Sequence, residues 1–295
     1  MSRDEVYKNW NPSPFNTGLV FSTSAAVCGV LPKKILYAAS DLLMDWYQGR
    51  KPETLASVRR NISGLFPSYS RKKLQELAEG TFTSYGRGFV DYLRSSIDPP
   101  IVVPTKGDLS HLKPDENGAR ILVTAHMGNW EIGGAYIGEL IGPHWIVDFP
   151  ERSGEVESFR RGKREKTGNM TMSAGGGLAS LFRMRKALES GTNLIFLVDR
   201  AVGRDSVEVL LRGRPTRFLK SPALLSALSG APLVPVAITR RGDGSYAARA
   251  GSPVYTGSDD DAGKTMQKAA DFFGEIMESY PDQWYNFFEY WREEP

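Results

Sequence analysis

Cysteine, histidine and net charge are all scarce in this sequence. Cys28 is the single cysteine among 295 residues, which excludes a disulfide framework and a cysteine-based zinc site. Two of the three histidines, His111 and His144, stand in polar loop contexts without ligand spacing, so we expect no metal site. The formal net charge of +3 suits an anionic surface or substrate but is too weak to indicate nucleic acid, and we expect no nucleic-acid partner.

The sequence also lacks an apolar run long enough to span a membrane. The longest one near the N-terminus, LVFSTSAAVCGVL at 19–31, is shorter than the roughly 20 residues that a spanning helix needs, and Pro32 closes it. Lys33 and Lys34 follow beside apolar and aromatic residues, which is typical of a helix on a membrane surface and equally of a helix packed on the core. With no secretory signal, we expect a cytoplasmic protein, with peripheral contact to the inner face of the cytoplasmic membrane left open.

What the sequence does contain is enough apolar material for a sizeable core, with 41% hydrophobic and 24% charged residues. Residues 1 to about 97 have a helical pattern. The stretch at 71–94 places apolar residues three and four positions apart, on one helix face. Ser70 is the expected N-cap of this helix, and Asp-Pro-Pro at 98–100 ends it. We expect 1–97 to form an N-terminal helical subdomain packed on the core.

Short apolar runs rich in β-branched residues begin at about residue 119. They alternate with helical or loop segments, which favours a largely parallel sheet buried on both faces. The expected fold is α/β, with a mixed, largely parallel central sheet flanked by helices over 98–295, continuous with the helical subdomain. A helix at 178–189 should end at Gly191, and ARA at 248–250 could add an edge strand. The main strands are expected at ARILVTA (119–125), HWIVDF (144–149), TNLIFLV (192–198) and APLVPVAIT (231–239).

His126 directly follows the strand at 119–125, and ligands of open α/β sheets bind at the carboxyl ends of strands. Glu131 comes five residues later, where its carboxylate can fold back onto the imidazole. A carboxylate on one ring nitrogen fixes the tautomer and raises the basicity of the other, so the pair could form a general base. Gly128 would let another backbone come close, and Asn129 would pin the turn. The alternative is that His126 is a structural residue of the turn, with its ring hydrogen-bonded and no role in catalysis. A serine hydrolase would need a G-x-S-x-G elbow, which is missing.

The stretch HMGNWE at 126–131 resembles the His-x4-Asp/Glu motif of the lysophospholipid acyltransferase superfamily. Its form is similar to the branch of the bacterial lipid A late acyltransferases and the phosphatidylinositol mannoside acyltransferases. The likeness continues in order over about residues 31–291. Four further stretches carry it, namely VRRNISGLFP (58–67), LVDRAVGRDSVEVLLRGRP (197–215), SPALLSALSGAPLVPVAI (221–238) and YPDQWYNFF (280–288).

The resemblance implies a bacterial acyltransferase of lipid biosynthesis. It would move a fatty acyl group from acyl-CoA or acyl carrier protein to a hydroxyl or amine of a glycolipid, lysolipid or metabolite, with no resident cofactor. His126 would be the general base and Glu131 its orienting carboxylate. No covalent enzyme intermediate is needed, because the thioester supplies the leaving group. The alternative is a non-catalytic lipid- or acyl-carrier-binding protein of the same fold, which predicts a broken dyad.

Other residues are carried over by the same resemblance. Asp199 and Arg200 would shape the acceptor and donor site, unless they form a structural ion pair. Arg164 would meet an anionic head group or the acyl carbonyl, unless it is one charge among many. Glu151 and the turn residues Gly128 and Asn129 complete the expected substrate-binding set at the carboxyl edge of the sheet.

Two departures and one requirement sharpen these expectations. Lipid A acyltransferases usually begin with a membrane-spanning helix, for which this sequence has no pattern. Asp199-Arg200-Ala201 stands where many members carry Asp-x-Asp. Both points argue against lipid A itself as the acceptor and leave the chemistry untouched. An acyl chain would also need an elongated apolar tunnel near His126, walled by the N-terminal helices and the strand before Asp199.

Overall fold

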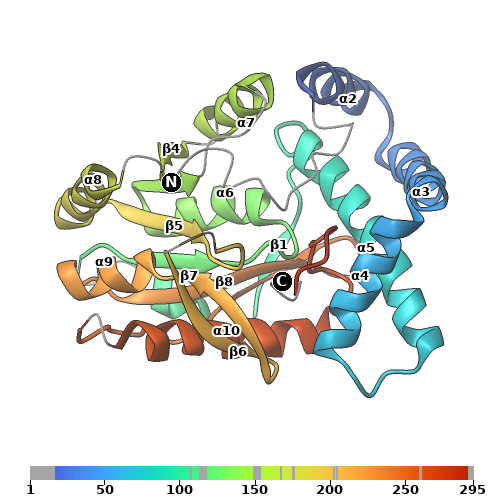
Figure 1. Ribbon diagram of the computed structural model, residues 1–295. Coiled ribbons are helices and arrows are strands. Elements are labelled where there is room, and N and C mark those ends of the chain that lie inside the picture. Colours follow the sequence, from blue (N-terminus) through green and yellow to red (C-terminus); the bar gives the residue numbers. More distant parts are fainter. Residues whose placement is uncertain are drawn as a thin grey trace.

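The N-terminal part of the molecule is helical, as expected (Figure 1). The computed structural model describes residues 17–291 apart from 106–107, 113–117, 149–153, 167, 175–176, 202, 204 and 259–260. Ser70 is the predicted N-cap, since its side chain accepts from the backbone N–H of Lys73. Among the described residues, no helix combines the length and the apolarity that crossing a membrane requires. The helices of this part are α2 (Gly18–Val30), α3 (Lys33–Arg50), α4 (Pro52–Leu65) and α5 (Arg71–Arg94).

The rest of the chain forms a seven-stranded sheet in the order β1-β9-β8-β2-β5-β3-β4 and a separate β6–β7 hairpin. All pairs of the large sheet are parallel except β8 with β9, which confirms the expected mixed, largely parallel sheet. The ARA stretch is a strand but not an edge, because β1 pairs with its outer side. The strands are β1 (Val102–Pro104), β2 (Ile121–Thr124), β3 (His144–Asp148), β4 (Met170–Ser173), β5 (Asn193–Leu197), β6 (Ser206–Leu211), β7 (Arg214–Leu219), β8 (Leu233–Arg240) and β9 (Tyr246–Ala250).

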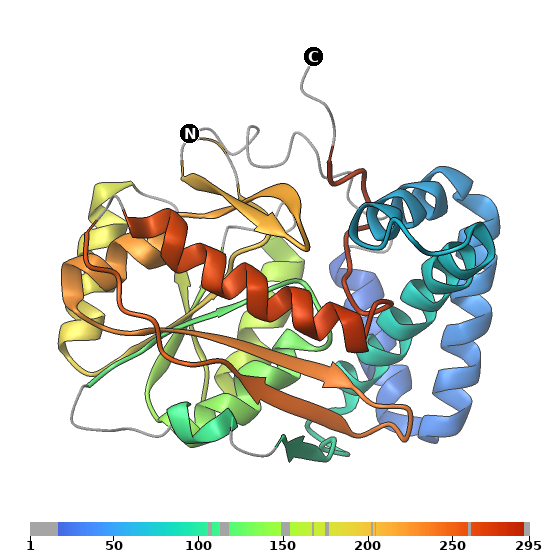
Figure 2. The ribbon, with the colours of Figure 1, turned by 90° about the horizontal axis from the view of Figure 1, so that it is seen from below.

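Helices cover both faces of this sheet. Successive side chains of a strand point to opposite faces, so Ile121 and Val123 of β2 pack into one hydrophobic cluster and Leu122 into another. The first cluster includes residues of α8, α9 and α10, and the second those of α6. Figure 2 shows α10 lying across its face of the sheet. These helices and the remaining ones are η1 (Asp108–Leu112), α6 (Trp130–Ile141), α7 (Gly154–Lys166), α8 (Leu178–Glu189), α9 (Ser221–Ser229) and α10 (Ala262–Ser279).

The N-terminal helices lie at the end of the sheet toward which β8 and its parallel neighbours point (Figure 2). The larger hydrophobic cluster is continuous across this junction, with Ile62 of α4 and Phe82 of α5 in the same cluster as Phe273 of α10. The helical layer therefore stands over the carboxyl ends of the strands. These ends are where an α/β sheet places its functional loops.

Candidate active site

His126 and Asp199 meet at the carboxyl end of the sheet. His126 Nδ1 lies 2.7 Å from Asp199 Oδ1, and the backbone N–H of His126 donates to the same oxygen at 3.0 Å. Strand register produces this contact, because Thr124 of β2 pairs with Leu197 of β5 and each site residue follows two positions later. When Nδ1–H is donated to a carboxylate, Nε2 of the neutral imidazole carries the available lone pair.

Asp199 is a fully buried carboxylate with an unusually complete set of donors. Its side chain is 0% exposed, and its second oxygen, Oδ2, accepts from Trp284 Nε1 at 2.9 Å. Burial alone would raise the pKa of this carboxyl. The facing His126, followed by Arg200 and the Trp284 hydrogen bond, outweighs burial and lowers the pKa from 3.8 to about 2. Asp199 is therefore a fixed anion at neutral pH.

The electrostatic surroundings of His126 favour a neutral ring. Burial, followed by the nearby positive charge of Arg200, lowers the pKa of His126 below its ordinary value of 6.5, against the opposing effect of Asp199. Its side chain still keeps 19% of its surface exposed. A neutral, anchored and partly accessible imidazole is what a general base at neutral pH requires.

The carboxylate against the imidazole is that of Asp199 and not that of Glu131, which corrects the prediction from sequence spacing. Glu131 accepts two hydrogen bonds from Arg164, at 2.7 Å from Nη2 and 3.0 Å from Nε. It lies in the first turn of α6, where its carboxylate helps to balance the buried guanidinium charge of Arg164 on α7. Arg164 lowers the pKa of Glu131 in spite of burial, which raises it.

Arg164 also binds Asp148 at the end of β3, with Nη1 2.9 Å from Oδ2. Its side chain is only 5% exposed. The guanidinium thus joins α6, α7 and β3 behind the turn that carries His126. The predicted contact of Arg164 with an anionic head group or acyl carbonyl stays a prediction.

The turn between His126 and α6 is shaped by two residues that the sequence singled out. Gly128 has a φ of +58°, and a Cβ there would lie 1.9 Å from the carbonyl oxygen of Ile238. This confirms the expected close approach of another backbone. Asn129 pins the turn as predicted, because its Oδ1 accepts from the N–H of Ile132 at 3.3 Å and caps α6.

The C-terminal segment 283–285 is hydrogen-bonded to the same turn, a role that sequence reasoning missed. The N–H of Gly128 donates to Gln283 O at 2.8 Å, and the N–H of Tyr285 donates to His126 O at 2.8 Å. Trp284 forms an isolated antiparallel bridge with Met127 and also reaches Asp199. The only signal in the sequence was the motif-like stretch YPDQWYNFF, which gave no hint of its position.

Arg200 belongs to this C-terminal contact as well. Its Nη2 donates to Tyr285 O at 2.6 Å and its Nε to Asn286 Oδ1 at 2.8 Å. The guanidinium therefore anchors the segment while its charge acts on His126 from nearby. Glu151, the last of the carried-over residues, lies outside the described residues.

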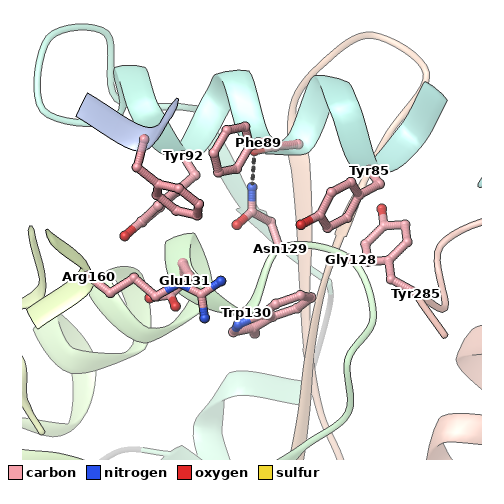
Figure 3. A pocket seen from close by; sticks show the side chains of 11 residues that line it. Tyr85, Phe89, Tyr92, Gly128, Asn129, Trp130, Glu131, Arg160 and Tyr285 are labelled. Carbon is pink, nitrogen blue, oxygen red and sulfur yellow. Dashed lines mark hydrogen bonds between the residues drawn. The ribbon is translucent and has the colours of Figure 1, made fainter. Parts of the chain in front are cut away.

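A small pocket of about 40 Å³ opens beside the turn (Figure 3). Gly128, Asn129, Trp130 and Glu131 line one side, and residues of α2, α5 and α7 with Tyr285 line the others, among them Phe21, Phe89 and Arg160. The N-terminal helices contribute as expected, whereas β5 contributes no lining residue. The expected elongated tunnel is also missing from this pocket, because aromatic side chains fill the space. The Phe21 and Phe89 rings pack edge to face there, with their centroids 5.2 Å apart.

The match to a family model decides the family. Residues 17–293 match the model of the bacterial lipid A biosynthesis acyltransferases. The chain belongs to this family. The match includes every residue of the site described above, from Phe21 to Asn286, and confirms the branch of the superfamily that the His-x-Gly-Asn-Trp-Glu stretch indicates.

Individual relatives share about 30% sequence identity with this chain or less. The chain is 30% identical over 183 residues to a phosphatidylinositol mannoside acyltransferase of Mycolicibacterium smegmatis, which covers 60% of this chain and 59% of the relative. It is 28% identical over 171 residues to the protein of that name from Mycobacterium tuberculosis, covering 56% and 52%. The matched part thus spans between half and three fifths of each relative. Among solved structures, a 1-acyl-sn-glycerophosphate acyltransferase of Thermotoga maritima is similar with a TM-score of 0.42 and 15% identity, covering 86% of this chain and 100% of that one.

Proposed function

We propose that this protein transfers a fatty acyl group from a thioester, on coenzyme A or acyl carrier protein, to a hydroxyl of a glycolipid acceptor. Membership in the acyltransferase family supports the reaction class. The names of the mannoside acyltransferases support a glycolipid acceptor over a lysolipid or a soluble metabolite. A hydroxyl at the carboxyl edge of the sheet is the group that His126 would activate.

The observation that carries the proposal is the bond between His126 Nδ1 and the buried Asp199 carboxylate at 2.7 Å. It leaves Nε2 as the base. Nε2 takes the proton of the acceptor hydroxyl while the oxygen attacks the thioester carbonyl. The tetrahedral intermediate then expels the thiolate by breaking the C–S bond, and the imidazolium returns its proton to the sulfur.

Asp199 has two tasks in this sequence of steps. It keeps the proton on Nδ1 in the resting ring, and it stabilises the imidazolium that forms when Nε2 is protonated. It does so without itself taking up a proton, since its own pKa is about 2. This replaces Glu131 as the orienting carboxylate in the mechanism we propose.

The acyl chain would enter the pocket between α2, α5 and the 128–131 turn. The pocket suits this role in its chemistry, since Phe21, Phe89 and Trp130 give it apolar and aromatic walls. Its present volume of about 40 Å³ is small for a long acyl chain. A long chain therefore requires Phe21 and α2 to move outward when it binds.

The outer surface of α2 and α3 suits contact with a lipid surface. Leu19, Val30 and Leu42 are between 71% and 83% exposed, and Trp46 is half exposed with Arg50 over its ring at 5.4 Å. Apolar and aromatic side chains next to basic ones are typical of helices that lie at a membrane interface. We propose that this face rests on the membrane that holds the acceptor.

The experiment that tests the function offers the purified protein acyl-CoA or acyl carrier protein together with candidate acceptors, including phosphatidylinositol mannosides, and identifies products by mass spectrometry. We expect an acylated glycolipid and stoichiometric free thiol. His126→Ala should lower the rate by at least about 10²- to 10⁴-fold, the usual contribution of a general base. Binding of the acyl donor without any product would instead support a non-catalytic lipid- or acyl-carrier-binding protein.

A further inference from the structure

A second buried carboxylate, Asp91 of α5, lies at the junction of the helical layer and the sheet. Its side chain is 0% exposed. Two cations face it, with Lys33 Nζ at 3.1 Å from Oδ1 and Arg240 Nε at 3.2 Å from Oδ2. Two phenols donate to it, Tyr37 to Oδ1 and Tyr246 to Oδ2, the latter at 2.7 Å. Asp91 thus ties α3 and α5 to the ends of β8 and β9.

One of these two phenols, that of Tyr246, also contacts a residue of the active-site turn. Tyr246 is completely buried, and a hydroxyl has a single proton to donate. Because that proton goes to Asp91, the Tyr246 oxygen is left as an acceptor, and Asn129 Nδ2 lies 3.2 Å from it. Asn129 Nδ2 also donates to Gly88 O of α5 at 2.9 Å, the contact drawn in Figure 3.

These bonds fix which way the Asn129 amide is turned. With its NH2 group held by Tyr246 and Gly88, its Oδ1 must point to the N–H of Ile132 at the start of α6. A reversed amide would place its oxygen against the lone pairs of two acceptors. The start of α6 carries Trp130, whose ring centroid lies 5.3 Å from that of His126. The chain of bonds therefore runs from Asp91 through Tyr246 and Asn129 to the neighbours of the imidazole.

We propose that Tyr246 is a positioning residue, which locks the Asn129 amide and thereby sets the turn and the imidazole of His126 in their reactive placement. The inference rests on the proposed function, in which His126 is the base. Misplacement of a reacting group by about 1 Å can cost roughly 10²-fold in rate. Because Asn129 keeps its bond to Gly88 when the phenol is removed, we expect a smaller loss, about tenfold in kcat.

Tyr37 provides the matched control. Tyr246→Phe and Tyr37→Phe each delete one phenolic hydroxyl that donates to Asp91, but only Tyr246 also accepts from Asn129. We expect Tyr246→Phe to lower kcat about tenfold with little change in KM, and Tyr37→Phe to leave kcat within about twofold. Both rates are measured well below the melting temperature of each variant. Equal kcat losses in the two variants, or a wild-type kcat in Tyr246→Phe, would overturn the proposal.

A second readout separates this inference from the proposed function. The chain has three histidines, so the ring-nitrogen resonances of His126 can be assigned by nitrogen NMR with His126→Ala as reference. They should shift in Tyr246→Phe and stay in place in Tyr37→Phe, whether or not any acceptor is acylated. Unchanged His126 resonances in Tyr246→Phe would refute the positioning role.

If Tyr246→Phe does not fold, Asn129→Ser takes its place. Serine keeps an oxygen that can cap α6 and removes the amide link to Tyr246 and Gly88. We expect it to lower kcat at least as much as Tyr246→Phe would, again with displaced His126 resonances. A folded Asn129→Ser variant with wild-type kcat would overturn the proposal.

Discussion

The exchange Asp199→Asn removes one charge and keeps the shape of the side chain. Three donors point at this group: the ring Nδ1 and backbone N–H of His126 at 2.7 and 3.0 Å, and Trp284 Nε1 at 2.9 Å. An amide has only one acceptor oxygen, so its NH2 group must face either His126 or Trp284. Facing His126, it favours the tautomer with the proton on Nε2, which leaves no lone pair for catalysis. The corresponding exchange in serine proteases costs about 10⁴ in kcat, and we expect a loss of about 10³- to 10⁴-fold with little change in KM.

The same exchange should have a limited effect on stability. The pKa of Asp199 falls from 3.8 to about 2 on folding, which corresponds to roughly 2 kcal/mol of stability at neutral pH. Because the folded pKa is lower than the unfolded one, this contribution is present above pH 3.8 and is lost as the pH falls toward about 2. Urea unfolding at pH 7 should therefore show Asp199→Asn less stable by about 2 kcal/mol, and still folded.

Compared with Asp199→Asn, Glu131→Gln should cost more stability and less activity. It removes one carboxylate from the buried guanidinium of Arg164, which keeps its contact with Asp148. Breaking a buried ion pair by removing one partner costs about 3–5 kcal/mol, while His126 and Asp199 stay in contact. We expect a larger stability loss than in Asp199→Asn and a kcat reduced by less than about tenfold in the folded fraction. A kcat near zero in folded Glu131→Gln, together with an active Asp199→Asn, would refute the dyad described above and restore Glu131 as the orienting group.

Three further outcomes follow from the pKa of His126, from the pocket and from the outer face of α2 and α3. Because burial and Arg200 lower the pKa of His126 below 6.5, kcat/KM should rise with pH up to an inflection below 6.5 and then stay level to pH 8; an inflection well above 7 would contradict this. Phe21→Ala should open the pocket, so that the optimum among acyl-CoA donors moves to longer chains; an unchanged chain-length profile would exclude this pocket as the acyl site. Binding to anionic vesicles, measured by sedimentation, should weaken in high salt and in Trp46→Ala. Release by detergent alone would rule out a peripheral contact.

Much of the framework can be predicted from local patterns in the amino-acid sequence. Alternating apolar runs and helical spacings predict the main strands, the helices of the N-terminal part and the placement of His126 at a strand end, because these patterns follow from local periodicity. Gly128 and Asn129 were also readable, since a glycine and an Asx residue in a tight turn act on their immediate neighbours. The pattern did not reveal β4 or the inner position of β9, whose short stretches carry little periodicity of their own.

The carboxylate that contacts the imidazole could be identified only from the assembled sheet. Glu131 is close to His126 in sequence, and Asp199 is 73 residues away. Strand pairing brings the distant residue to His126. Because β2 and β5 are neighbours with Thr124 paired to Leu197, the residues two positions beyond these two meet. The choice of neighbouring strand depends on how the whole sheet packs its two faces, and no local pattern encodes it. The same packing brings Trp284 to Asp199 and gives Arg164 to Glu131, which is why the dyad could be seen only once the sheet was assembled.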